Sequence, residues 1–364
     1  VFGFKYDFLP LVAFLLLRRV PWSPTFIRTA AAVLLGVGGV VAVYGIVTIF
    51  LPMSWFTALG YSDLHSLYVP GGSLAPFQQI EFIGIRRMQS TFSGPNQLGL
   101  WLLIPLSLGI LDWLRERKFI GFMVCLLIGV SIVLSFSRSA WIAAAVIGAV
   151  VAWKHFSRKQ VFLAASSLLV LGVIAVFMFP SVIIRATSSS GHIERPLQAL
   201  RIMKEHPFGL GLGSAGPASN RFSDACVDLP AGVDASWAVE HPQLCVFVGG
   251  AQIQPTNRAC TCPLLPENWY LQIGVELGWI GFILYVFLVA TILRRLFVQS
   301  AICNWILIAD CRLQSSCGLA FLAVSIAALF LHAWEDSAVA YTVWVLIAVA
   351  LSGEWHGRAW QHSE

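Results

Sequence analysis

Residues 131–153 read SIVLSFSRSAWIAAAVIGAVVAW, a nearly continuous apolar run that holds one guanidinium, Arg138, between Ser137 and Ser139. An arginine at the centre of a membrane-spanning helix costs about 2.5–3.5 kcal/mol on insertion scales, so it is retained where it faces water, a partner or a ligand. Two interpretations fit. Arg138 lies in a tight turn between two short helices and snorkels to the surface, or it lies at the floor of an outward-facing cavity and binds an anion.

The composition of the whole chain places this run in a polytopic helical membrane protein. The 364 residues are 58% hydrophobic and only 11% charged, with a mean hydropathy of +0.78, which excludes a water-soluble domain. We therefore expect an all-α bundle of transmembrane helices with one large outer loop domain. The formal net charge of +5 does not indicate nucleic-acid binding, because the basic residues cluster between apolar runs.

The apolar runs divide the chain into three parts. Residues 1–180 hold transmembrane helices and arginine-bearing outer segments, residues 181–266 form a large extracytoplasmic loop, and residues 267–364 hold the C-terminal transmembrane helices. The expected spans are residues 29–51, 96–111, 119–135, 140–153, 161–180, 269–293, 319–334 and 339–351. Residues 8–17 are apolar but short, so they are a tilted helix or the end of a truncated one. Because residue 1 is Val, the sequence is compatible with a fragment that lacks upstream helices.

The basic residues indicate one orientation. Alternate threading of the runs places 13 Lys and Arg residues on the cytoplasmic side, as the positive-inside rule requires. They are Arg18, Arg19, Arg28, Arg115, Arg117, Lys118, Lys154, Arg158, Lys159, Arg294, Arg295, Arg312 and Arg358. Arg86, Arg87 and Arg138 then lie on the outer side, where short connections should be poor in arginine. A binding site would produce such exceptions.

The cysteines agree with this orientation. Cys226, Cys245, Cys260 and Cys262 all fall in the outer loop, an even number in an oxidising compartment. We expect two disulfides, with three connectivities open, and adjacency disfavours a Cys260–Cys262 bond. A zinc site is the alternative, although the spacing matches no common finger pattern.

Two arginines begin the first polar motif, residues 86–96, RRMQSTFSGPN, which runs directly into an apolar span. Pro95 suits the first position of a helix, and Asn96 places a polar side chain at the membrane surface. In one interpretation Arg86 and Arg87 only meet lipid headgroups. In the other, two guanidiniums near a helix N-terminus form a phosphate receptor.

The outer loop holds the second motif, residues 206–214, HPFGLGLGS, preceded by Arg195 and Arg201. Glycines at every second position allow a close backbone approach to a ligand, or simply form an irregular turn. No dinucleotide fingerprint is present, because no strand precedes the glycines and no acidic ribose ligand follows them. The charges of the loop balance, so an anion site must come from selected arginines.

The third motif, residues 266–278, PENWYLQIGVELG, leads into the next span. Glu267 is either a helix-dipole cap, favourable by about 0.3–1 kcal/mol, or a general base that faces the arginines. His332, Glu335 and Asp336 mark the last outer corner and either join this site or remain in solvent.

Three blocks therefore follow one another along the chain. They are Arg87…Thr91-Phe92…Pro95-Asn96, then Ser137-Arg138-Ser-Ala-Trp141, then His206-Pro-Phe-Gly…Gly213 followed by Glu267-Asn268…Tyr270-Leu271…Glu276-Leu-Gly278. In content, order and the large loop between the second and last blocks, they resemble the O-antigen ligase/O-antigen polymerase superfamily. The resemblance covers roughly residues 86–281.

The resemblance implies a membrane glycosyltransferase that takes a glycan from an undecaprenyl-diphosphate carrier and moves it to an acceptor glycan or lipid A core. It implies surface polysaccharide or lipopolysaccharide biosynthesis in the bacterial inner membrane, with the active site on the periplasmic side. No cofactor, metal or nucleic acid is expected; membrane lipids and envelope-assembly proteins are expected partners. Ligases of the family carry His-Asn where this chain has Glu267-Asn268, which favours a polymerase or an undifferentiated relative.

The motifs and the resemblance together predict the site residues. The predicted catalytic residues are Glu267, Arg138 and Arg87, with the arginines on the diphosphate. The predicted substrate-binding residues are Arg86, Asn96, Arg195, His206, Gly211, Gly213, Asn268 and Tyr270. Two other classes stay open. A transporter of an anionic lipid-linked polysaccharide would use the same arginines without chemistry and should show two repeated halves, whereas a scaffold subunit would not need the arginines.

Overall fold

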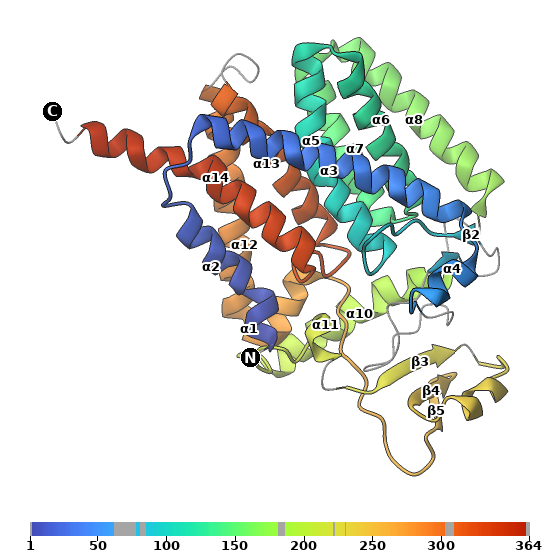
Figure 1. Cartoon of the computed structure of the whole chain (residues 1–364). Helices are drawn as coiled ribbons and strands as arrows, with labels where there is room; N and C mark the ends of the chain where they lie inside the picture. Colours follow the sequence, from blue (N-terminus) through green and yellow to red (C-terminus); the bar gives the residue numbers. More distant parts are fainter. Residues whose placement is uncertain are drawn as a thin grey trace.

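The structure, a computed structural model, describes residues 2–61, 78–80, 85–180, 186–220, 223–229, 231–302 and 309–361. It is mostly helical, which confirms the prediction of a helical membrane protein (Figure 1). Within the described residues, four helical stretches are long and apolar enough to cross a membrane. They are α3 (Pro24–Phe50), α5 (Pro95–Glu116), α8 (Arg158–Met178) and residues Trp269–Val298 of α12 (Trp269–Ile302).

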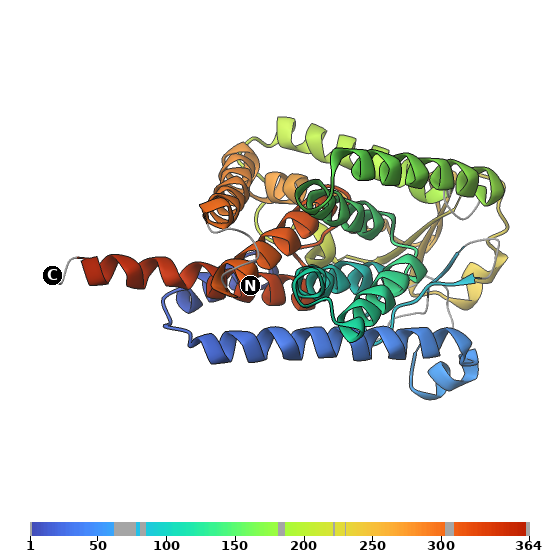
Figure 2. The ribbon, with the colours of Figure 1, turned by 90° about the horizontal axis from the view of Figure 1, so that it is seen from above.

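Helix α5 is the centre of the helical body. Leu98, Leu102 and Ile104 are completely buried, and α5 contacts α3, α6 (Phe119–Leu134), α7 (Arg138–His155), α13 (Ala309–Ala327) and α14 (Ser337–Gln361). Figure 2 shows α3, in blue, along one side of the body. Large apolar side chains on α3 and α8 are exposed, as expected for helices that face lipid tails.

The N-terminal segment forms two short helices, α1 (Phe2–Asp7) and α2 (Leu9–Leu17), and a further short helix, α4 (Met53–Ala58), follows α3. The apolar run at residues 8–17 contains the short helix α2. It packs on α14, where the rings of Phe14 and Trp344 lie 5.5 Å apart. Trp344 in turn contacts Trp334 and Phe321, so α2 and α14 share one buried aromatic cluster.

The outer loop differs from the predicted all-α fold, because it contains strands. It holds α10 (Ala186–Glu205), α11 (Gly216–Ser219), β3 (Ala225–Leu229), a 3-10 helix (Ser236–Glu240), β4 (Leu244–Val248) and β5 (Ala251–Gln254). The sheet order is β3-β4-β5, with β3 parallel and β5 antiparallel to β4. A second, two-stranded sheet pairs β1 (Gln79–Ile80) with β2 (Ile85–Arg86). The three-stranded sheet lies beyond the end of the helices where α1, α10 and α11 also lie (Figure 1).

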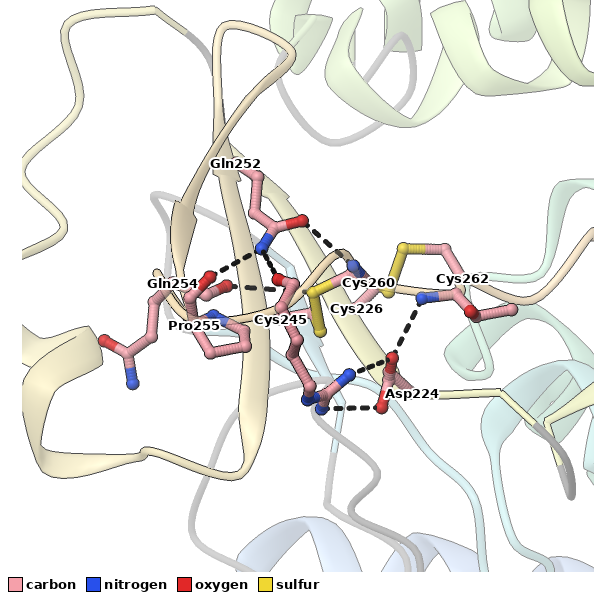
Figure 3. Close-up of polar contacts among 10 residues, drawn as sticks. Asp224, Cys226, Cys245, Gln252, Gln254, Pro255, Cys260 and Cys262 are labelled. Carbon is pink, nitrogen blue, oxygen red and sulfur yellow. Dashed lines mark hydrogen bonds and ion pairs between the residues drawn. A yellow bond between two sulfur atoms is a disulfide. The ribbon is translucent and has the colours of Figure 1, made fainter.

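Two disulfides fix this sheet to the segment that follows it, which confirms their predicted number. Cys226 bonds Cys262, and Cys245 bonds Cys260 (Figure 3). Asp224 accepts two hydrogen bonds from Arg258, at 2.7 and 2.8 Å, and these bonds hold the pKa of Asp224 below its usual range. The zinc alternative is wrong for these cysteines, because all four thiols are consumed by disulfides.

Two helix ends differ from the expected spans. The predicted span at residues 319–334 ends early, because α13 stops at Ala327 and a turn follows it. Trp334 then lies in the core, 1% exposed, so its apolar character reflects core packing after the turn and not a longer helix. Helix α7 begins at Arg138 itself, two residues before the predicted start of that span.

Candidate functional site: an arginine turn and a buried histidine chain

Arg138 is the first residue of α7, immediately after the tight turn that ends α6. Phe136 in this turn has a φ of 50°, and Ser137 precedes the helix in an extended conformation. Trp141 braces the turn, because its indole Nε1 donates to the carbonyl of Ile132 at 3.0 Å. The predicted turn between two short helices is therefore present, and Arg138 is half-buried at a helix N-terminus, where backbone N–H groups favour an anion.

Arg87 holds this turn in place. It is 8% exposed; its Nε donates to the carbonyl of Ser135 at 3.0 Å and its Nη2 to that of Phe136 at 3.3 Å. Nη2 also donates to Asn96 Oδ1 at 2.9 Å, and Nη1 donates to Gln78 Oε1 at 2.8 Å. Most of its five N–H groups thus donate to protein acceptors, and two of these bonds hold the backbone of the turn that precedes Arg138.

Arg86 points to a different element. Its Nη1 donates to the carbonyls of Thr48 at 3.0 Å and Leu51 at 2.7 Å, where α3 ends. Its guanidinium also lies over the ring of Phe56, 5.2 Å from the centroid. A cation at a helix C-terminus is favourable, so Arg86 stabilises the end of α3.

Glu267 belongs to a second cluster, at the start of α12. Its Oε1 accepts from Arg195 Nη1 at 2.5 Å, and its Oε2 lies 3.8 Å from His192 Nδ1, both on α10. Asn268, not Glu267, caps α12, because its Oδ1 accepts from the backbone N–H of Leu271 at 3.0 Å. The helix-cap interpretation of Glu267 is therefore replaced by an ion pair that ties α10 to α12.

A second set of hydrogen bonds lies one turn further along α12, at Gln272. His332 Nδ1 lies 2.6 Å from Gln272 Oε1, and Gln272 Nε2 donates to Glu335 Oε2 at 2.7 Å. Burial lowers the pKa of His332 to about 4 and raises the pKa of Glu335 to about 8. Asp336 stays outside this set, because it caps α14 by accepting from the N–H of Val339 at 3.0 Å.

The glycine motif packs against a break in α12. Gly278 has a φ of 70° inside the helix, and the N–H of Trp279 donates to the carbonyl of Pro207 at 3.1 Å. The N–H of Gly211 donates to the carbonyl of Glu276 at 2.9 Å, and that of Gly213 donates to Glu276 Oε1 at 3.0 Å. The glycines thus allow one backbone to approach another.

Residues 122–231 match the family model described as O-Antigen ligase. The resemblance to the O-antigen ligase/polymerase superfamily is confirmed. The match includes the Arg138 turn and the glycine motif, and it ends before Glu267. No curated protein matches the chain. The match and the apolar helices support a membrane enzyme of surface polysaccharide biosynthesis, with glycosyltransferase-type activity.

The predicted site residues fall into distinct places in the structure. Arg87, Asn96 and the Arg138 turn come together, and Glu267 and Arg195 come together. His206 is exposed at the end of α10. Tyr270 donates its hydroxyl to the carbonyl of Ser325 at 2.9 Å.

Asn268 and Tyr270 also line an apolar groove of about 420 Å³ between α12 and α13. The remaining lining residues are Leu271, Phe282, Val286, Val289, Ala290, Leu293, Leu322, Ser325, Ile326 and Leu329. Its lining is almost entirely apolar, so its chemistry suits a hydrocarbon chain and not a sugar.

Sequence reasoning missed His192 and Gln272 as members of the Glu267 cluster and left His332 and Glu335 undecided. The position of Gln272 in the sequence gives one indication. It lies five residues after Glu267, near the start of α12, among apolar neighbours. A buried amide at such a place needs polar partners. Those partners come from a turn about 60 residues away in sequence, which no local pattern reveals.

Proposed function

We propose that the protein moves a glycan from an undecaprenyl-diphosphate carrier to an acceptor sugar or lipid, as an O-antigen polymerase or ligase does. The observation that carries the proposal is Arg138, a half-buried arginine at the first position of α7. The turn before it is held by hydrogen bonds from a second arginine, Arg87. A guanidinium at a helix N-terminus, where the helix dipole also favours an anion, fits a diphosphate.

The chemistry of the transfer explains the need for these cations. When the bond between the anomeric carbon and the diphosphate breaks, negative charge develops on the leaving oxygen. Charges already oriented towards that position stabilise the transition state without reorganisation. Arg138 would contact the diphosphate. Arg87 would add positive electrostatic potential and keep the turn rigid through its hydrogen bonds. No metal is needed in this scheme.

Glu267 defines the acceptor side of the proposed site. It stands at the position where ligases of the family carry histidine, and its ion pair with Arg195 keeps the carboxylate oriented. We propose that Glu267 helps to activate the acceptor hydroxyl, with Asn268 and Arg195 at the same helix start. Both clusters would face the periplasm of a bacterial inner membrane, which the loop disulfides and the distribution of basic residues support.

The length of the products distinguishes the two forms of the proposal. Purified protein in detergent would receive a lipid-diphosphate-linked glycan with or without a separate acceptor. Products that grow stepwise indicate a polymerase, and a single transfer to the supplied acceptor indicates a ligase. Donor binding by folded protein without any product would contradict the proposed function and favour transport.

A further inference from the structure

The hydrogen bonds of Gln272 favour one tautomer of His332. The amide nitrogen of Gln272 donates to Glu335 Oε2 at 2.7 Å, and the amide oxygen faces His332 Nδ1 at 2.6 Å. An amide oxygen only accepts hydrogen bonds, so with the amide in this orientation the neutral imidazole has its hydrogen on Nδ1. Nε2 then keeps its lone pair, as in the carboxylate-oriented imidazole of acyl-transfer enzymes.

His332 Nε2 has no hydrogen-bond partner among the described residues, although it is closed off from solvent. A buried polar atom without a partner is costly and calls for an explanation. The side chain of His332 as a whole is only half-buried, and the turn that carries it is exposed at Leu329 (47%) and Phe330 (40%), so this is the side from which a substrate would reach Nε2. The lone pair of Nε2 can accept a proton from such a substrate.

The turn also lies directly beside the Glu267 cluster. The N–H of Trp269 donates to the carbonyl of Ala328 at 2.8 Å, and Asn268 Nδ2 donates to that of Leu329 at 2.9 Å. These bonds tie the start of α12 to the residues before His332. Glu267, Arg195 and His192 consequently act electrostatically on the imidazole.

Both carboxylate oxygens of Glu267 already face side chains of α10. One oxygen is bound by the Arg195 guanidinium at 2.5 Å, and the other faces the His192 imidazole at 3.8 Å. Glu267 is therefore engaged as an ion-pair partner. A carboxylate at that place can also stabilise a neighbouring imidazolium.

We propose that His332 Nε2 takes the proton of the acceptor hydroxyl, that Gln272 and Glu335 are positioning residues for it, and that Glu267 stabilises the resulting imidazolium. The inference rests on the proposed glycosyl transfer. The acceptor oxygen bonds to the anomeric carbon of the donor, the bond from that carbon to the diphosphate breaks, and the diphosphate leaves with the electron pair. The hydroxyl proton passes to Nε2 and then to water.

The test compares wild type, His332→Ala and His332→Gln in a transfer assay with purified full-length protein. The proposal expects a loss of kcat of about 10²–10⁴-fold for both variants, with donor binding unchanged. Added imidazole should restore activity to His332→Ala, an effect that a purely structural role would not produce. His241→Ala, on the outer sheet domain, is the matched control and should retain wild-type activity.

Gln272→Leu tests the positioning role. It should lower kcat and move the acid limb of the pH–rate profile to lower pH, because the imidazolium loses the acceptor for its Nδ1 hydrogen. Transfer at the wild-type rate by a folded His332 variant would overturn the inference and leave Glu267 as the base. Absence of transfer by wild type would instead contradict the proposed function. If His332→Ala does not fold, His332→Gln decides.

Discussion

At the scale of single residues, three arginines have separate positions in the structure. Arg86, Arg87 and Arg138 all stand out as cations on the side that should be poor in them. The structure assigns Arg86 to the end of α3, Arg87 to the Arg138 turn and Arg138 to the start of α7. Several partners of Arg86 and Arg87 are backbone carbonyls about 35 to 50 residues away. Because every residue has a backbone carbonyl, the sequence does not indicate which ones these arginines contact.

The pH profile of transfer tests the environment of His332. Burial lowers its pKa to about 4, against the raising effect of Glu267 and together with the lowering effects of Arg195 and His192. The imidazole is then neutral above pH 4 and is protonated only as the pH falls through that value. We therefore expect kcat/KM of wild type to retain its acid limb well below pH 6.

The measurement is kcat/KM between pH 4 and 9 at constant ionic strength. An acid limb near the ordinary histidine value of about 6.5 would contradict the buried environment. Gln272→Leu and wild type should be compared in the same buffers, because Glu335, with a pKa of about 8, titrates at the other end of the range.

At the scale of elements, hydropathy locates the helices but not their interruptions. The start of α5 at Pro95 follows from proline at the first position of a helix. The end of α13 and the break in α12 do not, because the apolar runs continue through Ala327 and Gly278. The strands β3 and β4 were not predicted, because the composition of residues 181–266 is that of a polar loop. The only local indication was the valine-containing stretches CVD (residues 226–228) and CVFV (residues 245–248), since β-branched residues favour strands.

The glycine motif gives a matched pair of substitutions. Gly209 and Gly211 both have positive φ, 84° and 97°, but a Cβ on Gly209 would collide with the backbone of Glu276, whereas a Cβ on Gly211 would meet nothing within 4 Å. Gly211→Ala should cost about 1–2 kcal/mol from its left-handed backbone alone. Gly209→Ala should cost more, because the contact between the loop and α12 must open.

Thermal unfolding of both variants in the same detergent checks this expectation. Equal melting temperatures would contradict the close approach of the two backbones. A Gly211→Ala variant that keeps its stability but loses transfer would in addition support the predicted role of Gly211 in binding substrate.

At the scale of the whole molecule, the distribution of charges and cysteines predicts one orientation in the membrane. The basic residues predict which loops are cytoplasmic, and the two disulfides of residues 181–266 are typical of an oxidising compartment. The connectivity could not be predicted, because three pairings were compatible with the spacing. Cys226 lies opposite Cys245 in the β3–β4 register, and each of them bonds a cysteine of the segment that follows β5.

Labelling in intact cells tests this orientation. A membrane-impermeant maleimide should react with the loop cysteines only after treatment with a membrane-impermeant reductant, because all four are paired. Cys125 and Cys317 are buried and should stay unlabelled. The variant with serine at Cys226, Cys245, Cys260 and Cys262 is the control. Labelling of the reduced loop that requires permeabilised cells would contradict an extracytoplasmic position.

The central claim is that Arg138 promotes glycosyl transfer from a lipid diphosphate without a metal, and one measurement tests it directly. Transfer from a purified undecaprenyl-diphosphate glycan is followed in detergent with EDTA for wild type, Arg138→Ala and Arg158→Ala. Arg158 begins α8 as Arg138 begins α7, but it lies in a predicted cytoplasmic loop. We expect wild type and Arg158→Ala to transfer at similar rates and folded Arg138→Ala to lose at least about 100-fold. Full activity of folded Arg138→Ala, or loss of wild-type activity in EDTA, would contradict the claim.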